Sequence, residues 1–198
     1  KSLIFLKTKK AINKKELADS NLRYLGMNIT YLLDVKLIGN YTKKKDITYK
    51  TNPNKLERKA VADIAYKNFN YSRFHLDNRL SFSKSNLIKK KTIENYFLGQ
   101  RGDKVFVQFY QKKISGFCLL KYEDYNVTRI ELICIDKKFS RKGLATDLLR
   151  FSLGDLKKKK DSKKIIVSTQ EKNIASTRLY DSFNFSTKSK FFLYHYIS

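Results

Sequence analysis

Two cations and a glycine stand at the start of a predicted helix in the second half of the sequence. Arg141, Lys142 and Gly143 follow an apolar run, and residues 144–149 have the amphipathic spacing of a helix. The first N–H groups of a helix lack intrahelical partners, and the helix dipole adds positive charge there. Glycine also lets an anion approach the backbone closely. The pattern indicates a diphosphate site; the alternative is a loop glycine beside solvated cations.

A second set of polar side chains falls on one face of a predicted helix. Asn173, Ser176 and Tyr180 are spaced by three and four residues, so that they share a face. An amide, a hydroxyl and a phenol stand there, where a purely structural helix would carry leucine. Half-buried packing is the alternative for Tyr180 alone. The neighbouring stripe, which we expect to face the core, consists of Ala175, Leu179 and Phe183.

Hydrophobic periodicity predicts the elements that position these residues. We expect helices over 14–25, 55–68, 86–98, 141–156 and 174–183. We expect an apolar start at 3–6 and strands over 28–38, 104–110, 114–122, 127–135, 163–169 and 190–196. Gln111, Lys112 and Lys113 predict a hairpin between two of these strands. This order implies an α+β fold with αβα layers, in which helices flank a mixed, mostly antiparallel sheet.

The only proline marks a predicted boundary within the chain. It lies in the turn signal Asn52-Pro53-Asn54, after a short mixed stretch of strand and helix. We therefore expect a small N-terminal α/β segment at 1–52 and the main domain at 53–198. The terminal strand at 190–196 is aromatic, and we expect it at the edge of the sheet, where it can pair with a second subunit in a homodimer.

Composition limits the classes of protein to which the chain can belong. Of its 198 residues, 41% are hydrophobic, which is enough for a core and argues against disorder. No apolar run approaches the roughly 18 residues of a membrane span, so we expect no membrane insertion. Cys118 and Cys134 lie in strand-like runs, which favours free thiols in a reducing cytoplasm.

The formal charge of +25 favours anionic ligands. A polycation binds nucleic acid by releasing counterions from the phosphates. Only nine of the 43 basic residues are arginine, however, and lysine is a poor bidentate reader of bases. We therefore expect no nucleic-acid partner, since a small substrate that carries phosphate suits the same field.

In their order and spacing, the two sets of polar residues together resemble the GNAT N-acetyltransferase superfamily over residues 56–198. The resemblance implies acetyl-CoA as co-substrate and no metal. It implies that a strand backbone holds the pantetheine arm, that loop amides hold the diphosphate, and that Tyr180 lies near the sulfur. The implied cofactor-binding positions are Ile133, Cys134, Ile135, Arg141, Lys142, Gly143, Leu144, Ala145, Thr146, Asn173 and Ser176. Ser140 replaces the usual Gln or Arg, and Asn184 replaces a glycine.

Four further segments are similar to the bacterial dTDP-fucosamine acetyltransferase branch of this superfamily. They are YSRFHLD (71–77), RIELICID (129–136), STQEKNIASTRLY (168–180) and FLYHY (192–196). The similarity implies acetylation of the amino group of a dTDP-linked 4-amino-4,6-dideoxyhexose, a step of surface polysaccharide or lipopolysaccharide biosynthesis. The segment before the core is shorter than the branch implies.

The resemblance also implies roles in catalysis by direct, sequential transfer. Neither cysteine has a recognisable histidine partner, so a thiol nucleophile is not expected. We expect Tyr180 to act as general acid toward the leaving thiolate, and the amides of Ile133 or Ile135 to polarise the carbonyl. Glu131 is the candidate base because period two places it on the strand face of Ile133 and Ile135; a pair with Arg129 or another basic neighbour is the alternative.

The loop between the first two core helices is the candidate wall of the acceptor site. Its candidate residues are Tyr71, Arg73, Phe74, His75 and Asp77. Arg73 is suited to the nucleotide diphosphate, and Phe74 or Tyr71 to stacking on a base or sugar. His75 and Asp77 are further candidates for the base. The alternative is an Arg73 salt bridge with Phe74 in the core.

Two other functions stay open at this point. One is a GNAT enzyme that acetylates a protein N-terminus, a ribosomal lysine or a tRNA-borne amine, which would also suit the high positive charge. The other is a non-catalytic basic module that binds RNA. The polar face of Asn173 and Tyr180 argues against the second, because RNA binding does not require it.

Overall fold

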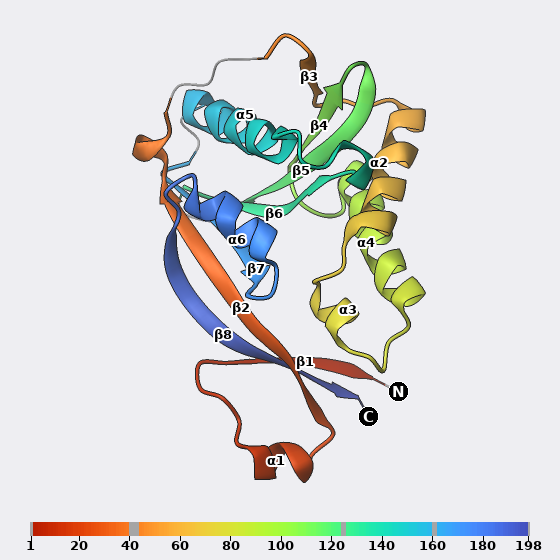
Figure 1. Ribbon diagram of the computed structural model, residues 1–198, viewed down its shortest axis with the longest axis vertical. Coiled ribbons are helices and arrows are strands. Elements are labelled where there is room, and N and C mark those ends of the chain that lie inside the picture. Colours follow the sequence, from red (N-terminus) through yellow and green to blue (C-terminus); the bar gives the residue numbers. More distant parts are fainter. Residues whose placement is uncertain (1, 40–43, 124–125, 160–161, 198) are drawn as a thin grey trace. The chain divides into compact units, whose positions relative to one another are not determined.

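The computed structural model describes residues 2–39, 44–123, 126–159 and 162–197 (Figure 1). Its helices are α1 (Lys14–Ala18), α2 (Lys55–Asn68), α3 (Arg73–Leu76), α4 (Phe82–Phe97), α5 (Leu144–Lys159) and α6 (Ile174–Asp181). Its strands are β1 (Leu3–Thr8), β2 (Leu22–Asp34), β3 (Ile47–Lys50), β4 (Lys104–Tyr110), β5 (Lys113–Glu123), β6 (Val127–Ile135), β7 (Lys164–Gln170) and β8 (Ser186–Ile197).

The strands confirm the predicted fold class. Their hydrogen-bonded order is β1-β8-β2-β7-β6-β5-β4-β3. The pairs β1/β8, β3/β4, β4/β5 and β5/β6 are antiparallel, while β6 and β7 are parallel. The fold is therefore α+β with a mixed, mostly antiparallel sheet.

The chain forms two compact units. Unit 1 comprises residues 1–31, 70–85 and 168–198, and unit 2 comprises residues 32–69 and 86–167. Strands β2 and β7 contribute residues to both units. The predicted boundary after residue 52 stays a prediction.

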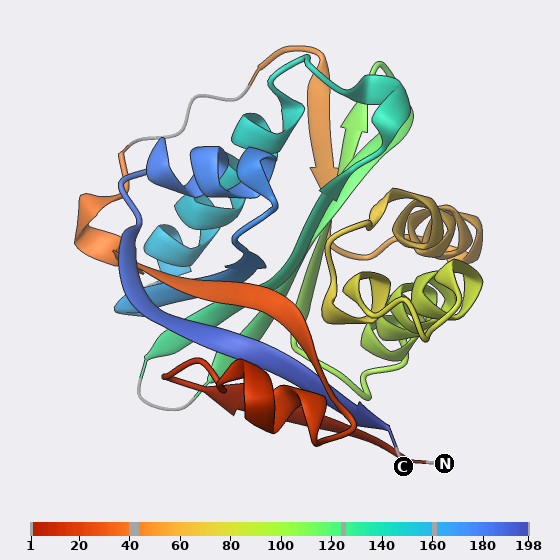
Figure 2. The same ribbon diagram turned by 60° about the horizontal axis from the view of Figure 1, so that its bottom comes forward.

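Unit 2 has helices on both faces of its strands. On one face, α2 packs Val61, Ala65 and their neighbours against Phe117 and Leu119 of β5. On the other face, α5 lies along β5 and β6 and buries Leu148, Leu149, Leu153 and Leu156. Figure 2 shows α2 and α5 on opposite sides of these strands. The αβα layering follows from two amphipathic helices that each bury an apolar stripe.

Helix α2 confirms its predicted range, and its start has a local cause. Asn54 accepts a hydrogen bond from the backbone of Glu57, whose side chain accepts one from the backbone of Asn54. This capping box satisfies two N–H groups at the helix start. The hairpin after β4 is also confirmed, with Gln111 and Lys112 in the left-handed region at φ 49° and 63°.

In unit 1, the prediction that the terminal strand lies at the edge of the sheet was wrong. β8 pairs with β1 in the register Leu3↔Ile197 to Thr8↔Phe192, and β2 is its other neighbour. The stretch 190–196 is therefore interior, and β1 is the edge strand. The prediction failed because the sequence of the short apolar stretch at 3–6 does not indicate which strand it pairs with.

Further elements differ from the prediction. The strand predicted at 28–38 is β2 at Leu22–Asp34, and the helix predicted at 86–98 already begins at Phe82. The helix predicted at 14–25 ends at Ala18, and β2 already begins at Leu22. Pairing along a strand of 13 residues outweighs a weak local preference for helix. The short strand β3 was not predicted, because its four residues form a strand only by pairing with β4.

Candidate functional site

Strand β6 is paired on both sides for only half of its length. It pairs with β5 from Val127 to Ile135, but its parallel ladder with β7 joins only 127–130 to 164–167. Among the described residues of unit 2, residues 131–135 therefore have a strand partner on the β5 side alone. An open strand edge of this kind offers N–H and C=O groups to an extended ligand. Ile133, Cys134 and Ile135, predicted to bind the cofactor, lie on it.

A bulge at Glu131 changes which face of β6 this residue occupies. Leu119 pairs with Leu132 and Leu120 pairs with Ile130, so that Glu131 is the extra residue. Leu132 and Cys134 belong to the α2 side of the core, and Glu131 accepts a hydrogen bond from Tyr96 in that same core. The prediction that Glu131 shares a face with Ile133 and Ile135 was wrong, since a bulge breaks the period of two.

Glu131 is held by two side chains that the sequence analysis did not single out. Tyr96 of α4 donates its hydroxyl to Oε2 at 2.5 Å, and Arg101 donates Nε to Oε1 at 2.7 Å. The Glu131 side chain is 15% exposed and that of Arg101 is 51% exposed. Burial, together with the hydrogen bond to Glu131, raises the pKa of Tyr96. Arg129, the predicted alternative partner, pairs with Glu123 instead.

Gly102 makes the position of Tyr96 possible. It has φ +69°, and a Cβ at this residue would lie 2.1 Å from the Tyr96 ring. The glycine lets the loop after α4 pass against the ring, so that the Tyr96 hydroxyl reaches Glu131. Gly102 is visible in the sequence, but its role could not be predicted, because only the fold places the Tyr96 ring beside it.

The loop after β6 has the backbone of an anion site. Arg141 and Gly143 both lie in the left-handed region, at φ +61° and +72°. The first hydrogen bond of α5 runs from Asp147 N to Gly143 O at 3.1 Å, so the preceding N–H groups belong to the unpartnered start of the helix. Left-handed residues alternating with other conformations turn successive N–H groups into a concave nest. The helix predicted at 141–156 is present, but it begins at Leu144 and ends at Lys159, so that 141–143 belong to the loop.

The surroundings of Gly143 are open. A Cβ at this position would meet no atom within 4 Å, so the positive φ is what requires glycine in the ligand-free chain. The one acidic residue of the first turn, Asp147, is 2% exposed and pairs with Lys44 at 2.8 Å. Arg141 and Lys142 are exposed, and Lys142 Nζ lies 5.3 Å from the centre of the Tyr110 ring. The loop therefore presents positive charge.

Helix α6 in unit 1 carries the second predicted set. Asn173 caps the helix, since its Oδ1 accepts a hydrogen bond from Ser176 N at 3.3 Å. Tyr180 is 3% exposed, with its ring 5.6 Å from those of Tyr31 and Phe185. Of the predicted core-facing stripe, Ala175 is exposed, while Leu179 and Phe183 are half-buried. Tyr180 is the fully buried residue of this helix, so the core lies toward its side.

The predicted acceptor loop lies in unit 1, and its residues differ in exposure. Tyr71 is 45% exposed, and His75 is half-buried beside Ser72, whose Oγ lies 2.6 Å from His75 Nδ1. The guanidinium carbon of Arg73 lies 4.2 Å from the Phe5 ring and 4.7 Å from the Phe74 ring. The predicted alternative was an Arg73 salt bridge with Phe74 in the core, whereas these contacts are cation–π contacts and Phe74 is half-buried.

Asp77 is fully buried in an ion-pair network. It accepts two hydrogen bonds from the Arg79 guanidinium, each 2.9 Å, and its Oδ2 lies 3.0 Å from His195 Nδ1. Burial alone would raise the pKa of Asp77, but the hydrogen bonds from Arg79 and His195 lower it to about 2. Asp77 is fully buried and both of its oxygens are engaged, so a substrate amine cannot reach it without displacing these contacts.

Both cysteines are free and buried, as predicted. Burial raises the pKa of Cys118 and of Cys134 to about 12, which leaves both as neutral thiols at physiological pH. Among the described residues no group of three or more His, Cys, Asp or Glu is placed to hold a metal ion. No helix in the described ranges is long and apolar enough to cross a membrane.

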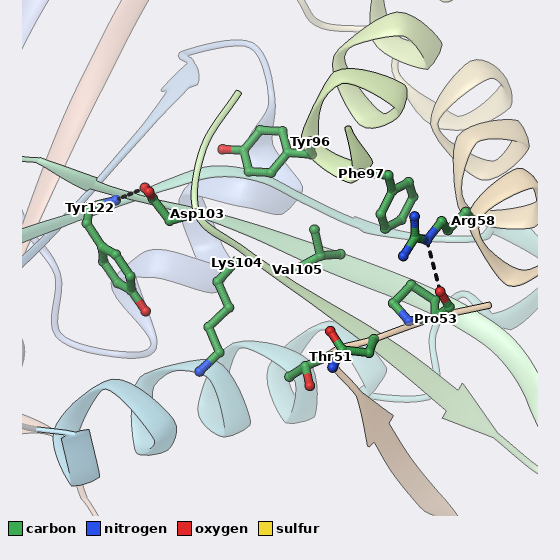
Figure 3. A pocket seen from close by; sticks show the side chains of 10 residues that line it. Thr51, Pro53, Arg58, Tyr96, Phe97, Asp103, Lys104, Val105 and Tyr122 are labelled. Atoms are coloured by element: carbon green, nitrogen blue, oxygen red, sulfur yellow. Dashed lines mark hydrogen bonds between the residues drawn. The ribbon is translucent and has the colours of Figure 1, made fainter. Parts of the chain in front are cut away.

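Unit 2 also has a pocket of about 450 Å³ (Figure 3). Its lining residues are Thr51, Asn52, Pro53, Arg58, Tyr96, Phe97, Asp103, Lys104, Val105 and Tyr122. Arg58 Nε donates to Pro53 O at 2.9 Å, and Asp103 accepts from Tyr122 N at 2.6 Å. Lys104 pairs with Asp155 at 2.5 Å. Protein groups engage the charges of Arg58, Asp103 and Lys104, and the hydroxyl of Tyr96 connects this pocket to the Glu131 carboxylate.

Comparisons with known proteins agree with this geometry. The sequence matches the model of the acetyltransferase (GNAT) family over residues 66–185. No curated protein sequence matches the chain.

Solved structures share the fold at low sequence identity. A GCN5-related N-acetyltransferase from Sphaerobacter thermophilus has a TM-score of 0.64 at 14% identity, over 98% of this chain and 59% of that chain. One from Kribbella flavida has a TM-score of 0.62 at 9% identity, over 92% of this chain and 62% of that chain. A functionally unknown conserved protein from Staphylococcus epidermidis has a TM-score of 0.69 at 13% identity, over 97% and 72%. The chain thus spans less than two thirds of the first two structures.

Proposed function

The chain belongs to the acetyltransferase (GNAT) family, and we propose that it transfers an acetyl group from acetyl-CoA to a primary amine. The observation that carries the proposal is the open edge of β6 at 131–135, followed after a short connection by the nest at 141–144. Extended backbone suits the amide groups of a pantetheine arm, and a nest suits a diphosphate. The two features occur in the order in which acetyl-CoA carries these groups.

The residues present fit this co-substrate. The backbone of 133–135 would pair with the pantetheine arm, and the N–H groups of 141–146 would hold the diphosphate. Arg141 and Lys142 supply exposed positive charge beside those N–H groups. Asn173 and Ser176 stay proposed contacts of the co-substrate, although Asn173 also caps its own helix. Acetyl-CoA supplies the acetyl group as an activated thioester.

Tyr180 is the proposed general acid. A phenol can donate its proton to the departing sulfur, whose negative charge develops as the thioester bond breaks. The backbone amides of Ile133 or Ile135 would donate hydrogen bonds to the carbonyl oxygen in the same step. Neutral, buried thiols at Cys118 and Cys134 make poor nucleophiles, which supports direct transfer over an acyl-enzyme.

Glu131 is the proposed base that accepts a proton from the amine. Its carboxylate keeps part of its surface exposed, whereas Asp77 is fully buried. Arg101 occupies Oε1, and its side chain is half exposed. We expect an incoming cationic amine to replace Arg101 at that oxygen, because both are donors to the same carboxylate.

We propose a dTDP-linked amino-deoxysugar as the acceptor. The similarity of residues 71–77 to the dTDP-fucosamine acetyltransferase branch supports this choice, and so does the net charge of +25, which favours a substrate that carries phosphate. On that loop, Tyr71 and His75 offer the accessible surface for the base or sugar, and Arg73 offers its cation.

A thiol-release assay tests both levels of this proposal. Acetyl-CoA is mixed with the protein and one amine from a panel of dTDP- and UDP-amino sugars, lysine-containing peptides and aminoacyl-tRNA. We expect CoA release with a dTDP-amino sugar and none with peptides or tRNA. Release with peptides alone would contradict the nucleotide-sugar acceptor but keep acetyl transfer. Absence of release with every amine would contradict acetyl transfer.

A further inference from the structure

Gln108 is a polar residue in the middle of an apolar strand. It lies on β4 next to Val107, and both residues are 0% exposed. A buried amide costs free energy unless its donors and acceptor are satisfied. The contacts of this side chain therefore show what it is there to hold.

The Gln108 amide bridges two strands and a helix. Its Nε2 donates to Leu144 O at 3.1 Å and reaches Tyr49 Oη at 3.4 Å. Its Oε1 accepts from Ser115 Oγ at 3.0 Å. Because the carbonyl oxygen of Leu144 can only accept a hydrogen bond, the amide is oriented with its NH₂ group toward the helix.

Leu144 is the residue directly after Gly143, and its carbonyl belongs to the first turn of α5. The hydrogen bond from Gln108 thus ties the start of this helix to β4. Tyr110, two residues further along β4, adds a second contact with the loop, since its ring lies 6.2 Å from that of Phe139. The C-terminal half of β4 therefore braces the loop from the side of the core.

We propose that Gln108 is a positioning residue that fixes the nest at 141–144 and thereby sets its affinity for a diphosphate. The assignment rests on the proposed function, and Gln108 itself does not touch the ligand. Among the described residues, the Arg141 side chain makes no hydrogen bond or ion pair, and a Cβ on Gly143 would meet no atom within 4 Å. The helix start to which they are joined is locked through Leu144 O instead.

Two substitutions separate this role from general stability. Gln108→Met keeps the length of the side chain and removes all of its hydrogen bonds. Thr128→Val is the matched control, because Thr128 is also 0% exposed, lies on β6 in the same unit, and loses a buried hydrogen bond to Ser162 beyond the C-terminal end of α5. Gln108→Met loses buried contacts at the N-terminal end of α5, and Thr128→Val loses a buried contact beyond its C-terminal end.

The readout is calorimetric binding of CoA and, separately, of inorganic diphosphate. We expect Gln108→Met to weaken both by about fivefold or more, which is the loss of one well-made hydrogen bond. Thr128→Val should bind both ligands as the wild type does, at a similar loss of melting temperature. Hydrogen exchange at 144–148 should accelerate in Gln108→Met only. If Gln108→Met fails to fold, Ser115→Ala takes its place, because it removes the hydrogen bond to the amide oxygen. Ser115→Ala should then weaken the binding of CoA and of diphosphate more than Thr128→Val does.

The outcomes separate the positioning role from the proposed function. If the wild type binds CoA and Gln108→Met or Ser115→Ala binds it equally well, the positioning role is overturned while the proposed function stands. Equal weakening by Thr128→Val also overturns the role, because the effect then follows from stability. If the wild type binds neither CoA nor diphosphate, the proposed function fails, and the positioning role fails with it.

Discussion

Tyr180 combines two properties at the scale of the single residue. Its ring packs between Tyr31 and Phe185, and its hydroxyl is the proposed proton donor. Packing alone requires only the ring, whereas proton donation requires the oxygen. A substitution that keeps the ring therefore isolates the chemistry.

Tyr180→Phe should lower the turnover number by about 100-fold or more, because a lost general acid has effects of that size. The dissociation constant for CoA should stay within about twofold, since the ring is retained. Steady-state kinetics and calorimetry measure the two quantities. Tyr31→Phe, which removes a hydroxyl from the neighbouring ring, should leave turnover nearly unchanged. Normal turnover in Tyr180→Phe would remove this residue from the mechanism.

His195 shows a different use of a buried polar residue. It is 0% exposed between the rings of Phe5 and Phe74, and its Nδ1 faces Asp77, which Arg79 also contacts. Burial lowers the pKa of His195, and the nearby cations add to this, while Asp77 acts in the opposite direction. Its Nε2 has no hydrogen-bond partner among the described residues. The neutral imidazole is thus the form that the fold accommodates.

The pKa shifts of His195 and Asp77 predict loss of stability in acid. The unfolded histidine binds protons below about pH 6.5 more readily than the folded one, so its contribution is present above that pH and declines below it. Asp77, with a folded pKa of about 2 against 3.8, adds a second decline of about 2 kcal/mol below pH 4. Urea unfolding between pH 7 and 2 measures both.

The other histidine supplies the control for this pH dependence. His75→Gln should keep the decline between pH 6.5 and 4.5, whereas His195→Gln should flatten it. Both variants remove one imidazole from unit 1, but only His195 is fully buried. An unchanged slope in His195→Gln would show that the decline has another origin.

At the scale of elements, the path from β6 through the loop to α5 positions the proposed site. Its last strand residues form an open edge, and the left-handed Arg141 and Gly143 turn the chain into the helix. Gly116 of β5 helps to place that edge, since a Cβ there would lie 2.4 Å from Cys134 O. The close approach of β5 to β6 therefore depends on a residue with no side chain.

Gly143→Ala and Gly99→Ala form a matched pair that tests the nest. Both glycines have φ near +70°, and neither would place a Cβ within 4 Å of another atom. Each substitution should cost about 1 kcal/mol of unfolding free energy for the left-handed backbone alone. Only Gly143→Ala should also weaken CoA binding, because only its loop carries the proposed diphosphate site. Equal CoA affinities in the two variants would contradict this assignment.

The sequence predicted the elements of this region better than it predicted their contacts. The strand 127–135 and the helix that follows RKG both follow from local patterns, and the structure has both, with the helix beginning at Leu144. The bulge at Glu131 depends on the register with β5, which no local pattern encodes. The hydrogen bonds from Arg101 to Glu131 and from Gln108 to Leu144 join residues 30 and 36 positions apart.

At the scale of the whole molecule, a net charge of +25 gives the surface a positive field. CoA carries several phosphate charges, so this field and the cations of the loop should both favour its binding. Raising the salt from 50 to 500 mM should therefore weaken CoA binding by about fivefold, because exposed charges are screened. Calorimetry at the two salt concentrations measures the effect, and Arg141→Gln should reduce it. An affinity that does not depend on salt would contradict a role for the field.

Calorimetric titration of the wild-type chain with CoA tests the central claim most directly. The account predicts one binding site per chain, with inorganic diphosphate as a competitor, since both ligands use the N–H groups of 141–146. Absence of a binding signal at millimolar CoA would contradict it, and so would CoA binding that diphosphate leaves unchanged.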